Sequence, residues 1–326
     1  MPKPKEKKNN KPYPIALACA DLHLSLKRPA CREDDWMEVQ AGYLKQLRKI
    51  QAEATSASDE DGPRKCKQVP ILCAGDIFDR WNVQPELINF ALKHLPDGMV
   101  CIPGQHDLPN HRLEEMHRSA YGVLVESKKI VDITNDGVCT YGLSINGFGW
   151  GQEIKPPSEI EGLESLIKVA LVHKFIWTDG TGYPGAPEES RWPRLMPKLK
   201  GYQVVVFGDN HKPFKIVGDT TIFNCGGFIR RKIDDDHRPR VGIIFSNGDI
   251  IPKFLDTSGD KIRRPEEVQE VGELDLKKFI TDLETLGDAA LDFAGIVRRH
   301  LESSDLSGAV RERVLKCLEN GADSRL

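Results

Sequence analysis

The chain has 326 residues and lacks the sequence features of membrane-spanning, secreted and structural-zinc proteins. No apolar run approaches the roughly 18–20 residues needed to cross a membrane, so no membrane partner is expected. The N-terminal residues contain no apolar segment of the kind that a secretory signal requires. None of the 8 cysteines forms a Cys-x-x-Cys pair, and Cys73 and Cys101 lie within apolar runs, as small buried residues do. These absences favour a protein of the reducing cytoplasm.

A strong charge of either sign is also absent, and aromatic residues are few. The formal net charge is −3, so a nucleic-acid partner would need a local basic surface rather than a basic field over the whole protein. Apolar residues make up 39 %, charged residues 29 % and aromatic residues 7 %, as in an ordinary globular protein with a sizeable core. The lysine-rich residues 1–12 are expected to form a disordered basic tail.

The hydrophobic pattern of the first half predicts an α/β fold. Apolar residues recur at helical spacing over residues 34–54, and a polar loop is expected over residues 55–68. A second helix is predicted over residues 84–94, with Pro85 near its first turn. Buried strands are predicted at residues 14–20, 69–74 and 99–102. Because strands and helices alternate, a sheet flanked by helices is expected.

The second half predicts further strands and then a change of character. Short strands are expected between residues 130 and 148, joined by the turn signal Asn135-Asp136-Gly137. Two buried strands and three closing antiparallel strands are predicted at residues 169–172, 204–207, 221–224, 241–245 and 250–254. A domain over residues 13–258 would then be followed by a helical C-terminal segment, residues 259–326. Its three amphipathic helices are predicted at residues 274–286, 289–301 and 307–318.

Acids, histidines and one amide follow the predicted buried strands. They are Asp21, His23, Asp76, Gln105, His173, Asp209 and His211. A parallel or mixed sheet brings such strand ends together in space. Oxygen and imidazole ligands without a thiolate suit a catalytic Mn²⁺, Fe²⁺ or Zn²⁺ ion better than a structural zinc ion. Seven candidates are enough for two ions bridged by a carboxylate, which at about 3.5–4 Å apart clamp an in-line displacement at phosphorus and supply a bridging hydroxide.

The ordered series of segments resembles the calcineurin-like metallophosphoesterases. Their pattern is Asp-x-His, Gly-Asp-x-x-Asp, Gly-Asn-His-Asp/Glu, a lone His and Gly-His-x-His. The corresponding segments here are Asp21-Leu22-His23, Gly75-Asp76-Ile77-Phe78-Asp79, Gly104-Gln105-His106-Asp107, His173 and Gly208-Asp209-Asn210-His211. The resemblance covers residues 13–255 and implies a two-sheet β-sandwich flanked by helices, an α/β (α+β layered) fold with the helical segment as a C-terminal tail.

The resemblance also implies roles for these residues. The first metal would be held by Asp21, His23 and His211, Asp76 would bridge both metals, and His173 would hold the second. The nearby non-ligand histidine would be His106, which would protonate the leaving oxygen or stabilise the phosphorane. Asp107 would then orient the imidazole of His106, as carboxylates commonly do.

Two departures from the family pattern fall on the second metal. Gln105 stands where the family has Asn, and it offers the same amide oxygen on a stem one methylene longer. Asp209 stands where the family has His, and it exchanges a neutral nitrogen for an anionic oxygen. This exchange makes the site harder and more negative, so Mn²⁺ or Mg²⁺ is favoured over Zn²⁺. Two divalent ions are expected, with Mn²⁺ first and Mg²⁺, Fe²⁺ or Zn²⁺ as alternatives, although a weakened second site that leaves one tightly bound ion is the competing interpretation.

Within the superfamily the chain resembles the SbcD-type DNA repair exonucleases and their phage relatives. Four features carry this resemblance: Asp21-Leu22-His23-Leu24, Gly75-Asp76-Ile77-Phe78-Asp79, the ending in Asp107, and Asn224-Cys225-Gly226-Gly227 before Arg230-Arg231. It implies hydrolysis of DNA phosphodiester bonds in a repair or recombination complex, in a bacterial or phage-infected host cytoplasm. It also implies an SbcC-like ATPase subunit docked on the helical tail, and a homodimer. The basic residues that could grip a DNA backbone are Arg230, Arg231, Lys232, Arg238 and Arg240.

Two other functions are compatible with the same residues. A small-molecule or nucleotide phosphodiesterase or phosphatase would use the same fold, and Asp79-Arg80 resembles the protein phosphatases. However, Trp81 replaces the Gly that usually follows that Arg, and Asp107 replaces their Glu. A binding subunit whose degraded metal site no longer cleaves is the other alternative, supported only by Gln105 and Asp209.

Overall fold

The computed structural model describes residues 11–62, 68–157, 164–183, 185–232 and 238–263. The chain divides into two compact units, residues 1–265 and 266–326, and the described residues all belong to the first. The three predicted C-terminal helices and most of the predicted basic tail, residues 1–10, lie outside the described residues. None of the described helices is long and apolar enough to span a membrane.

The first sheet has 6 strands in the order β12-β11-β1-β2-β3-β4. Strands β1 to β4 run parallel to one another, whereas β11 runs antiparallel to β1 and β12 runs antiparallel to β11. These strands are β1 (Pro14–Cys19), β2 (Ile71–Cys73), β3 (Met99–Cys101), β4 (Ile130–Asp132), β11 (Arg240–Phe245) and β12 (Ile250–Phe254). Strand β1 is wholly buried because both faces of the sheet are covered.

The second sheet also has 6 strands, in the order β5-β6-β7-β8-β10-β9. Strands β6, β7, β8 and β10 are parallel, and the edge strands β5 and β9 are antiparallel to their neighbours. These strands are β5 (Val138–Thr140), β6 (Leu143–Phe148), β7 (Ile167–His173), β8 (Val204–Gly208), β9 (Phe214–Ile216) and β10 (Thr221–Asn224). The parallel strands of both sheets therefore carry the segments that contain the candidate ligands.

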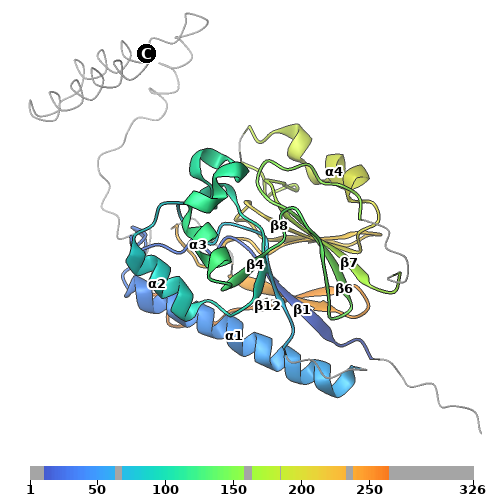
Figure 1. Cartoon of the computed structure of the whole chain (residues 1–326), viewed down its shortest axis with the longest axis horizontal. Helices are drawn as coiled ribbons and strands as arrows, with labels where there is room; N and C mark the ends of the chain where they lie inside the picture. Colours follow the sequence, from blue (N-terminus) through green and yellow to red (C-terminus); the bar gives the residue numbers. More distant parts are fainter. Residues whose placement is uncertain (1–10, 63–67, 158–163, 184, 233–237, 264–326) are drawn as a thin grey trace, which may run out of the picture. The chain divides into compact units, whose positions relative to one another are not determined.

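The two sheets pack face to face and helices cover their outer faces (Figure 1). Alternate residues of β1 divide between the layers: Ala16 and Ala18 face the second sheet, and Leu17 and Cys19 face the helices. The helices on the first sheet are α1 (Trp36–Asp61), α2 (Pro85–His94) and α3 (Ala120–Glu126), and α4 (Trp192–Leu199) packs on the second. The predicted two-sheet α/β fold is confirmed.

Helix α1 is longer than its apolar pattern predicts. It begins after Asp35, whose carboxylate accepts the N–H groups of Met37 and Glu38 as an N-cap. It continues to Asp61 through the polar stretch expected to be a loop. The hydroxyl of Thr55 donates to the carbonyl of Gln51, so a polar side chain is satisfied within the helix. The prediction of a loop from residue 55 is therefore wrong over its first seven positions.

The turn signal at Asn135-Asp136-Gly137 does not join a hairpin. Strand β4 before it lies in the first sheet and β5 after it lies in the second, so this segment crosses between the sheets. The hairpin forms instead between β5 and β6 at Tyr141 and Gly142, whose φ angles are 47° and 79°. Residues 221–224 were also expected to be a closing antiparallel strand, but β10 pairs parallel with β8 and is antiparallel only to β9.

The segment after β12 remains attached to the first unit beyond residue 258. The guanidinium of Arg32 is fully buried and pairs with Asp34 at 2.7 Å and with Asp260 at 3.0 Å. The phenol of Tyr43 also donates to Asp260 at 2.8 Å. The Arg263 N–H donates to the carbonyl of Cys31 at 2.8 Å. A buried charge requires such pairing, so these contacts hold the residues up to Arg263 against the rest of the first unit.

Candidate metal centre

The predicted ligands come together where the parallel strands of both sheets end. Asp21 follows β1, Asp76 follows β2, and Gln105 follows β3, while His173 ends β7 and Asp209 follows β8. Residues that are far apart along the chain therefore lie close together in space, because the carboxyl ends of parallel strands meet at one edge of a sheet. The metal-ligand atoms of the described residues form three groups, each with all atoms within 4.8 Å of one another. The groups are Asp21, His23 and His211; His23, Asp76 and His106; and Asp21, Asp76 and His173.

The first group combines one carboxylate and two imidazoles. The Nε2 atoms of His23 and His211 face each other at 3.0 Å. One oxygen of Asp21 accepts the backbone N–H of Asp209 at 2.9 Å, which fixes the carboxylate beside the two rings. Asp21 and His23 are buried, with 1 % and 3 % of their surface exposed. This first-metal cluster is the one that the sequence pattern predicts without any departure.

Asp76 lies between the two predicted ion positions. Its Oδ2 is 3.6 Å from the Nε2 of His23 and 3.4 Å from the Nε2 of His173. Its other oxygen accepts the backbone N–H of His106 at 3.0 Å, which leaves Oδ2 directed between the two imidazoles. This is the position that a bridging carboxylate would occupy.

The second-metal cluster, which we define as Gln105, His173 and Asp209, is connected by hydrogen bonds. The Gln105 amide N–H donates to Asp209 at 2.8 Å, so its Oε1 faces the Nε2 of His173 at 2.7 Å. The Nδ1–H of His173 donates to the carbonyl of Ala74 at 2.6 Å, which fixes the ring. The longer stem of Gln105 thus reaches His173. Asp209 is absent from the three ligand groups of the described residues and meets the cluster through the Gln105 amide.

Four residues of the centre have left-handed backbone conformations. The φ angles are 55° at Asp21, 45° at His23, 55° at Asp76 and 84° at Asp209. Such values are uncommon for residues with a Cβ atom, and strained backbone of this kind concentrates at functional sites. The strain turns each side chain from the end of its strand into the shared centre.

Glycines allow the loops to approach each other closely. A Cβ atom on Gly75, whose φ is 94°, would collide with the imidazole of His173. A Cβ atom on Gly104 would collide with the carboxylate of Asp76. Glycine is thus required at positions 75 and 104, because a larger residue would not fit where these loops contact His173 and Asp76.

Burial and mutual charge set the protonation of the buried groups. Burial disfavours the charged form of Asp76, but His173 and then His23 outweigh it and hold the pKa of Asp76 well below its usual value. Burial raises the pKa of Asp21 and lowers that of His23. For His173, burial opposes the positive charge, yet Asp76, Asp21 and Asp209 together raise its pKa to about 10.

The donor atoms fit divalent metal ions. Asp21 Oδ2 and Asp76 Oδ2 are buried and have no hydrogen-bond partner among the described residues. An unsatisfied buried polar atom costs about 1–3 kcal/mol, and a charged one costs more. A divalent cation would satisfy both oxygens, and the mixed oxygen and imidazole set is one that Mn²⁺, Fe²⁺ and Zn²⁺ accept. The residues present therefore fit the ions that the sequence pattern implies.

Comparison with known proteins shows the family to which the chain belongs. Residues 16–213 match the family model described as calcineurin-like phosphoesterase. The chain belongs to this family.

Among solved structures, the chain is similar to a Thermus thermophilus protein, TT1561, at 13 % identity with a TM-score of 0.43, over 74 % of this chain and 99 % of that one. It is also similar to a metallophosphoesterase from Sphaerobacter thermophilus at 13 % identity with a TM-score of 0.37, over 76 % of this chain and 89 % of that one. No curated protein matches the chain. Membership in the phosphoesterase family implies a hydrolase that acts on phosphoesters and binds divalent metals.

The phosphoesterase histidine His106 lies beside the first-metal cluster on an exposed turn. Its ring centroid is 5.0 Å from that of His23. Its Nδ1 lies 2.9 Å from the backbone carbonyl of Asp79. Because a carbonyl only accepts, Nδ1 carries the hydrogen and Nε2 is the nitrogen available for chemistry.

Asp107 has a different role from the expected one. Its buried carboxylate accepts the backbone N–H groups of Ile77, Phe78 and Gly104 at 3.2, 3.0 and 3.0 Å. It therefore ties the Asp76 loop to the Gln105 loop. The prediction that Asp107 orients His106 directly is wrong, because the carbonyl of Asp79 holds that ring.

The centre opens on a cleft with a basic lining. This basic cleft has a volume of about 480 Å³, and its lining includes His106, His211 and five cationic side chains. The cations are Lys27, Arg28, Arg80, Arg231 and Lys232. Arg231 pairs with the carboxylate of Asp79 at 2.8 Å, so Asp79 connects the cleft wall to the His106 ring through one carboxylate and one carbonyl.

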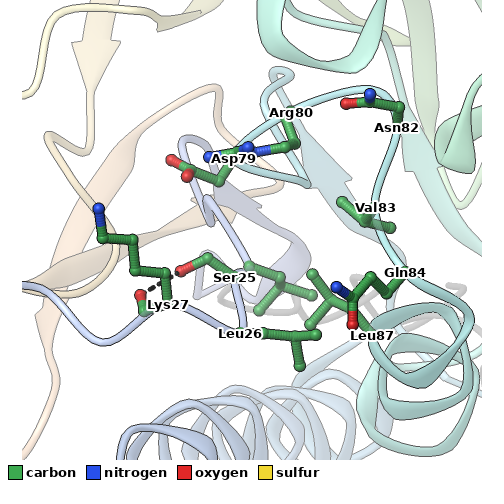
Figure 2. A pocket seen from close by; sticks show the side chains of 10 residues that line it. Ser25, Leu26, Lys27, Asp79, Arg80, Asn82, Val83, Gln84 and Leu87 are labelled. Atoms are coloured by element: carbon green, nitrogen blue, oxygen red, sulfur yellow. Dashed lines mark hydrogen bonds between the residues drawn. The ribbon is translucent and has the colours of Figure 1, made fainter.

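A smaller hollow adjoins the basic cleft and shares Lys27, Asp79 and Arg80 with it (Figure 2). Its volume is about 250 Å³, and its aliphatic wall includes Leu26 and Val83. Arg80 of the Asp79-Arg80 pair and the predicted basic residues Arg231 and Lys232 thus lie at the cleft. Lys27 and Arg28 were missed by the sequence analysis, although their position four and five residues after His23 was a usable signal.

Proposed function

We propose that this chain is a metal-dependent phosphodiesterase that hydrolyses DNA, as an exonuclease or an endonuclease. The observation that supports this proposal most strongly is the basic cleft beside the metal centre. Five cationic side chains line it, although the whole chain carries a net charge of −3. Clustered cations beside a hydrolytic centre suit a substrate with several phosphates, because each phosphate contact adds electrostatic affinity.

In this proposal Asp21, His23 and His211 would hold the first ion, and Asp76 would contribute to both ions. The second ion would be held by Asp76, His173 and Gln105, and Asp209 would orient the Gln105 amide. Such ions, of which Mn²⁺ is the first choice, would withdraw charge from the phosphoryl oxygens and lower the pKa of water.

His106 would act as the general acid of the reaction. Its Nδ1–H is held by the Asp79 carbonyl, so its Nε2–H can be given to the leaving oxygen of the ester. The exposed position of His106 at the basic cleft lets a substrate reach it. Arg231, fixed by Asp79, would hold a phosphate of the same substrate, because a guanidinium offers a planar set of donors to phosphate oxygens.

A small phosphodiester is the second candidate substrate, and one feature favours it. The aliphatic hollow of Figure 2 adjoins the basic cleft and could hold the apolar part of a single small ester. A long nucleic acid has no need of such a hollow. The two candidates therefore use different parts of the same surface.

The test of the proposed function compares substrates and two histidine variants. Purified protein with Mn²⁺ is incubated with labelled single- or double-stranded DNA, and separately with bis-p-nitrophenyl phosphate. We expect cleavage of DNA that His106→Asn lowers by about 10²- to 10³-fold and that His117→Asn retains. His117 is a matched control because it is also exposed and its Nδ1 also faces a carbonyl, that of Glu114 at 3.2 Å. Hydrolysis of the small ester alone would favour the second candidate, and no activity with any divalent metal would favour a binding subunit.

The proposal extends to partners and location by the same resemblance. An SbcC-like ATPase subunit would dock on residues 259–326, the active form would be a homodimer, and the protein would work in the cytoplasm. A pull-down with the ATPase compares the full chain with residues 1–265, which contain the complete first unit. We expect the shorter chain to lose binding, and unchanged binding would rule out residues 266–326 as the docking site.

A further inference from the structure

A second hollow opens beside the second-metal cluster and has an aromatic lining. Its volume is about 370 Å³, and it is lined by the side chains of Trp150 and Phe175 together with His173 itself. It shares no lining residue with the basic cleft, which is lined by residues of the first-metal cluster. An aromatic surface thus continues directly onto one candidate metal ligand, and its function is not explained by the metal centre alone.

Trp150 is held firmly at the edge of this aromatic hollow. Its backbone N–H donates to the carbonyl of Pro103 at 3.1 Å, one residue before Gly104. The neighbouring Gly149 N–H donates to the side chain of Gln152 at 2.9 Å, which closes the turn around Trp150. The indole centroid lies 6.4 Å from the ring of His173. The indole is therefore fixed relative to the second-metal cluster by both backbone and ring contacts.

Cationic side chains accompany the rings. Lys174 and Lys198 line the aromatic hollow, against one acid, Glu153. Rings flanked by lysines are what single-stranded nucleic acid binds, because bases stack on the rings while the phosphates follow the positive charge. Inside a duplex the bases are already stacked on both faces, so away from its ends only an unpaired base can offer a face to an indole.

We infer that Trp150 is the stacking platform for the base next to the phosphate cleaved at the metal centre. The substrate is then DNA with an unpaired base at that position, either a single strand or a frayed end. This inference rests on the proposed nuclease function and narrows it to one class of DNA. Trp150 is a specificity residue in this account, and it takes no part in the chemical step.

The test uses Trp150→Ala and Trp150→Phe with three substrates in Mn²⁺. The substrates are a single-stranded oligonucleotide, the same oligonucleotide with an abasic nucleotide beside the cleaved bond, and bis-p-nitrophenyl phosphate. Loss of one stacked base should lower kcat/KM of Trp150→Ala on the intact strand by about 10- to 100-fold. Trp150→Phe should restore most of it. The abasic strand should be cleaved equally by wild type and Trp150→Ala, and the small ester should be hydrolysed at an unchanged rate.

Controls separate stacking from a structural effect. Tyr141→Ala removes an exposed aromatic ring at the hairpin between β5 and β6, which lines neither the aromatic hollow nor the basic cleft, and should change none of these rates. An equal loss on DNA and on the small ester would overturn the inference, because Trp150 would then act only by supporting His173. Unchanged cleavage of the intact strand by Trp150→Ala would also overturn it. If wild type hydrolyses the small ester but no DNA, the proposed nuclease function fails first and the inference falls with it.

Discussion

Apart from the shared Asp76, the metal centre has two halves, the first-metal cluster of Asp21, His23 and His211 and the second-metal cluster of Gln105, His173 and Asp209. The two halves differ in how far their polar atoms are satisfied by hydrogen bonds within the protein. In the first half, Asp21 keeps a buried oxygen without a hydrogen-bond partner among the described residues. In the second half, the Gln105 amide connects His173 to Asp209 through hydrogen bonds of 2.7 and 2.8 Å. The first half needs a cation to be satisfied, whereas the second half is largely satisfied by its own side chains.

This difference has a consequence for metal affinity. An ion in the first half would satisfy the buried Asp21 oxygen, which otherwise has an unfavourable environment. An ion in the second half must first compete with existing hydrogen bonds. His173 adds to the competition, because its Nδ1–H faces Ala74 and its Nε2 faces the Gln105 oxygen, so a proton on Nε2 stands where an ion would bind. Two ions of unequal affinity are therefore expected, with the looser one in the half that departs from the family pattern.

The largest effect should come from Asp76, which belongs to both halves. Asp76→Asn removes the shared anionic charge, so kcat/KM on bis-p-nitrophenyl phosphate should fall by about 10⁴-fold, with loss of metal from both positions. Activity and bound metal are measured together. Asp219→Asn, on an exposed carboxylate, is the control and should behave as wild type. Retention of one tightly bound ion in Asp76→Asn would show that the halves do not share this residue.

A smaller effect is expected from His106, which we propose as the general acid and not as a ligand of either ion. His106→Asn should lower DNA hydrolysis by about 10²- to 10³-fold while the bound metal stays the same. The loss should be smaller on bis-p-nitrophenyl phosphate, whose leaving group needs little protonation. Equal losses on both substrates, or a loss of metal, would contradict the role of His106 as the acid.

Gln105 provides the test that separates the halves. Gln105→Leu removes the amide and leaves an apolar side chain that ends one atom earlier, so affinity for the second ion should fall about 10- to 100-fold while affinity for the first is unchanged. Calorimetry with Mn²⁺ gives both affinities. Gln84→Leu, an exposed glutamine in the hollow of Figure 2, is the matched control. An equal weakening of both ions by Gln105→Leu would remove the distinction between the halves.

The smallest effect should come from the basic cleft beside the first half. Lys27→Gln removes one exposed cation, so DNA hydrolysis at low salt should fall only a few-fold, and the slope of log affinity against log salt should fall by about 1. Lys49→Gln on α1 serves as the control, since Lys49 is also exposed and does not line the cleft. A loss with no change in salt dependence would argue against a phosphate contact.

The sequence predicted the layers and the members of the centre, but not their detailed contacts. Asp21, Asp76 and His173 could be identified because each follows an apolar run that had to be a buried strand. The end of α1 could not, because Thr55 and its polar neighbours resemble a loop until their hydroxyls bond back to the helix. Asp107 was assigned to His106 by the family resemblance, whereas three backbone N–H groups from two loops compete for its carboxylate. Trp150 gave no motif at all, since its position depends on a backbone contact to Pro103.

The most direct test of the unequal halves is a calorimetric titration of metal-free protein with Mn²⁺, with activity on bis-p-nitrophenyl phosphate measured at each step. The account predicts two binding events, with the first tight and nearly silent in activity and the second looser by at least about tenfold and accompanied by the rise in turnover. Full activity after one equivalent of Mn²⁺ would contradict the two-metal centre. Two ions bound with equal affinity would contradict the difference between its halves.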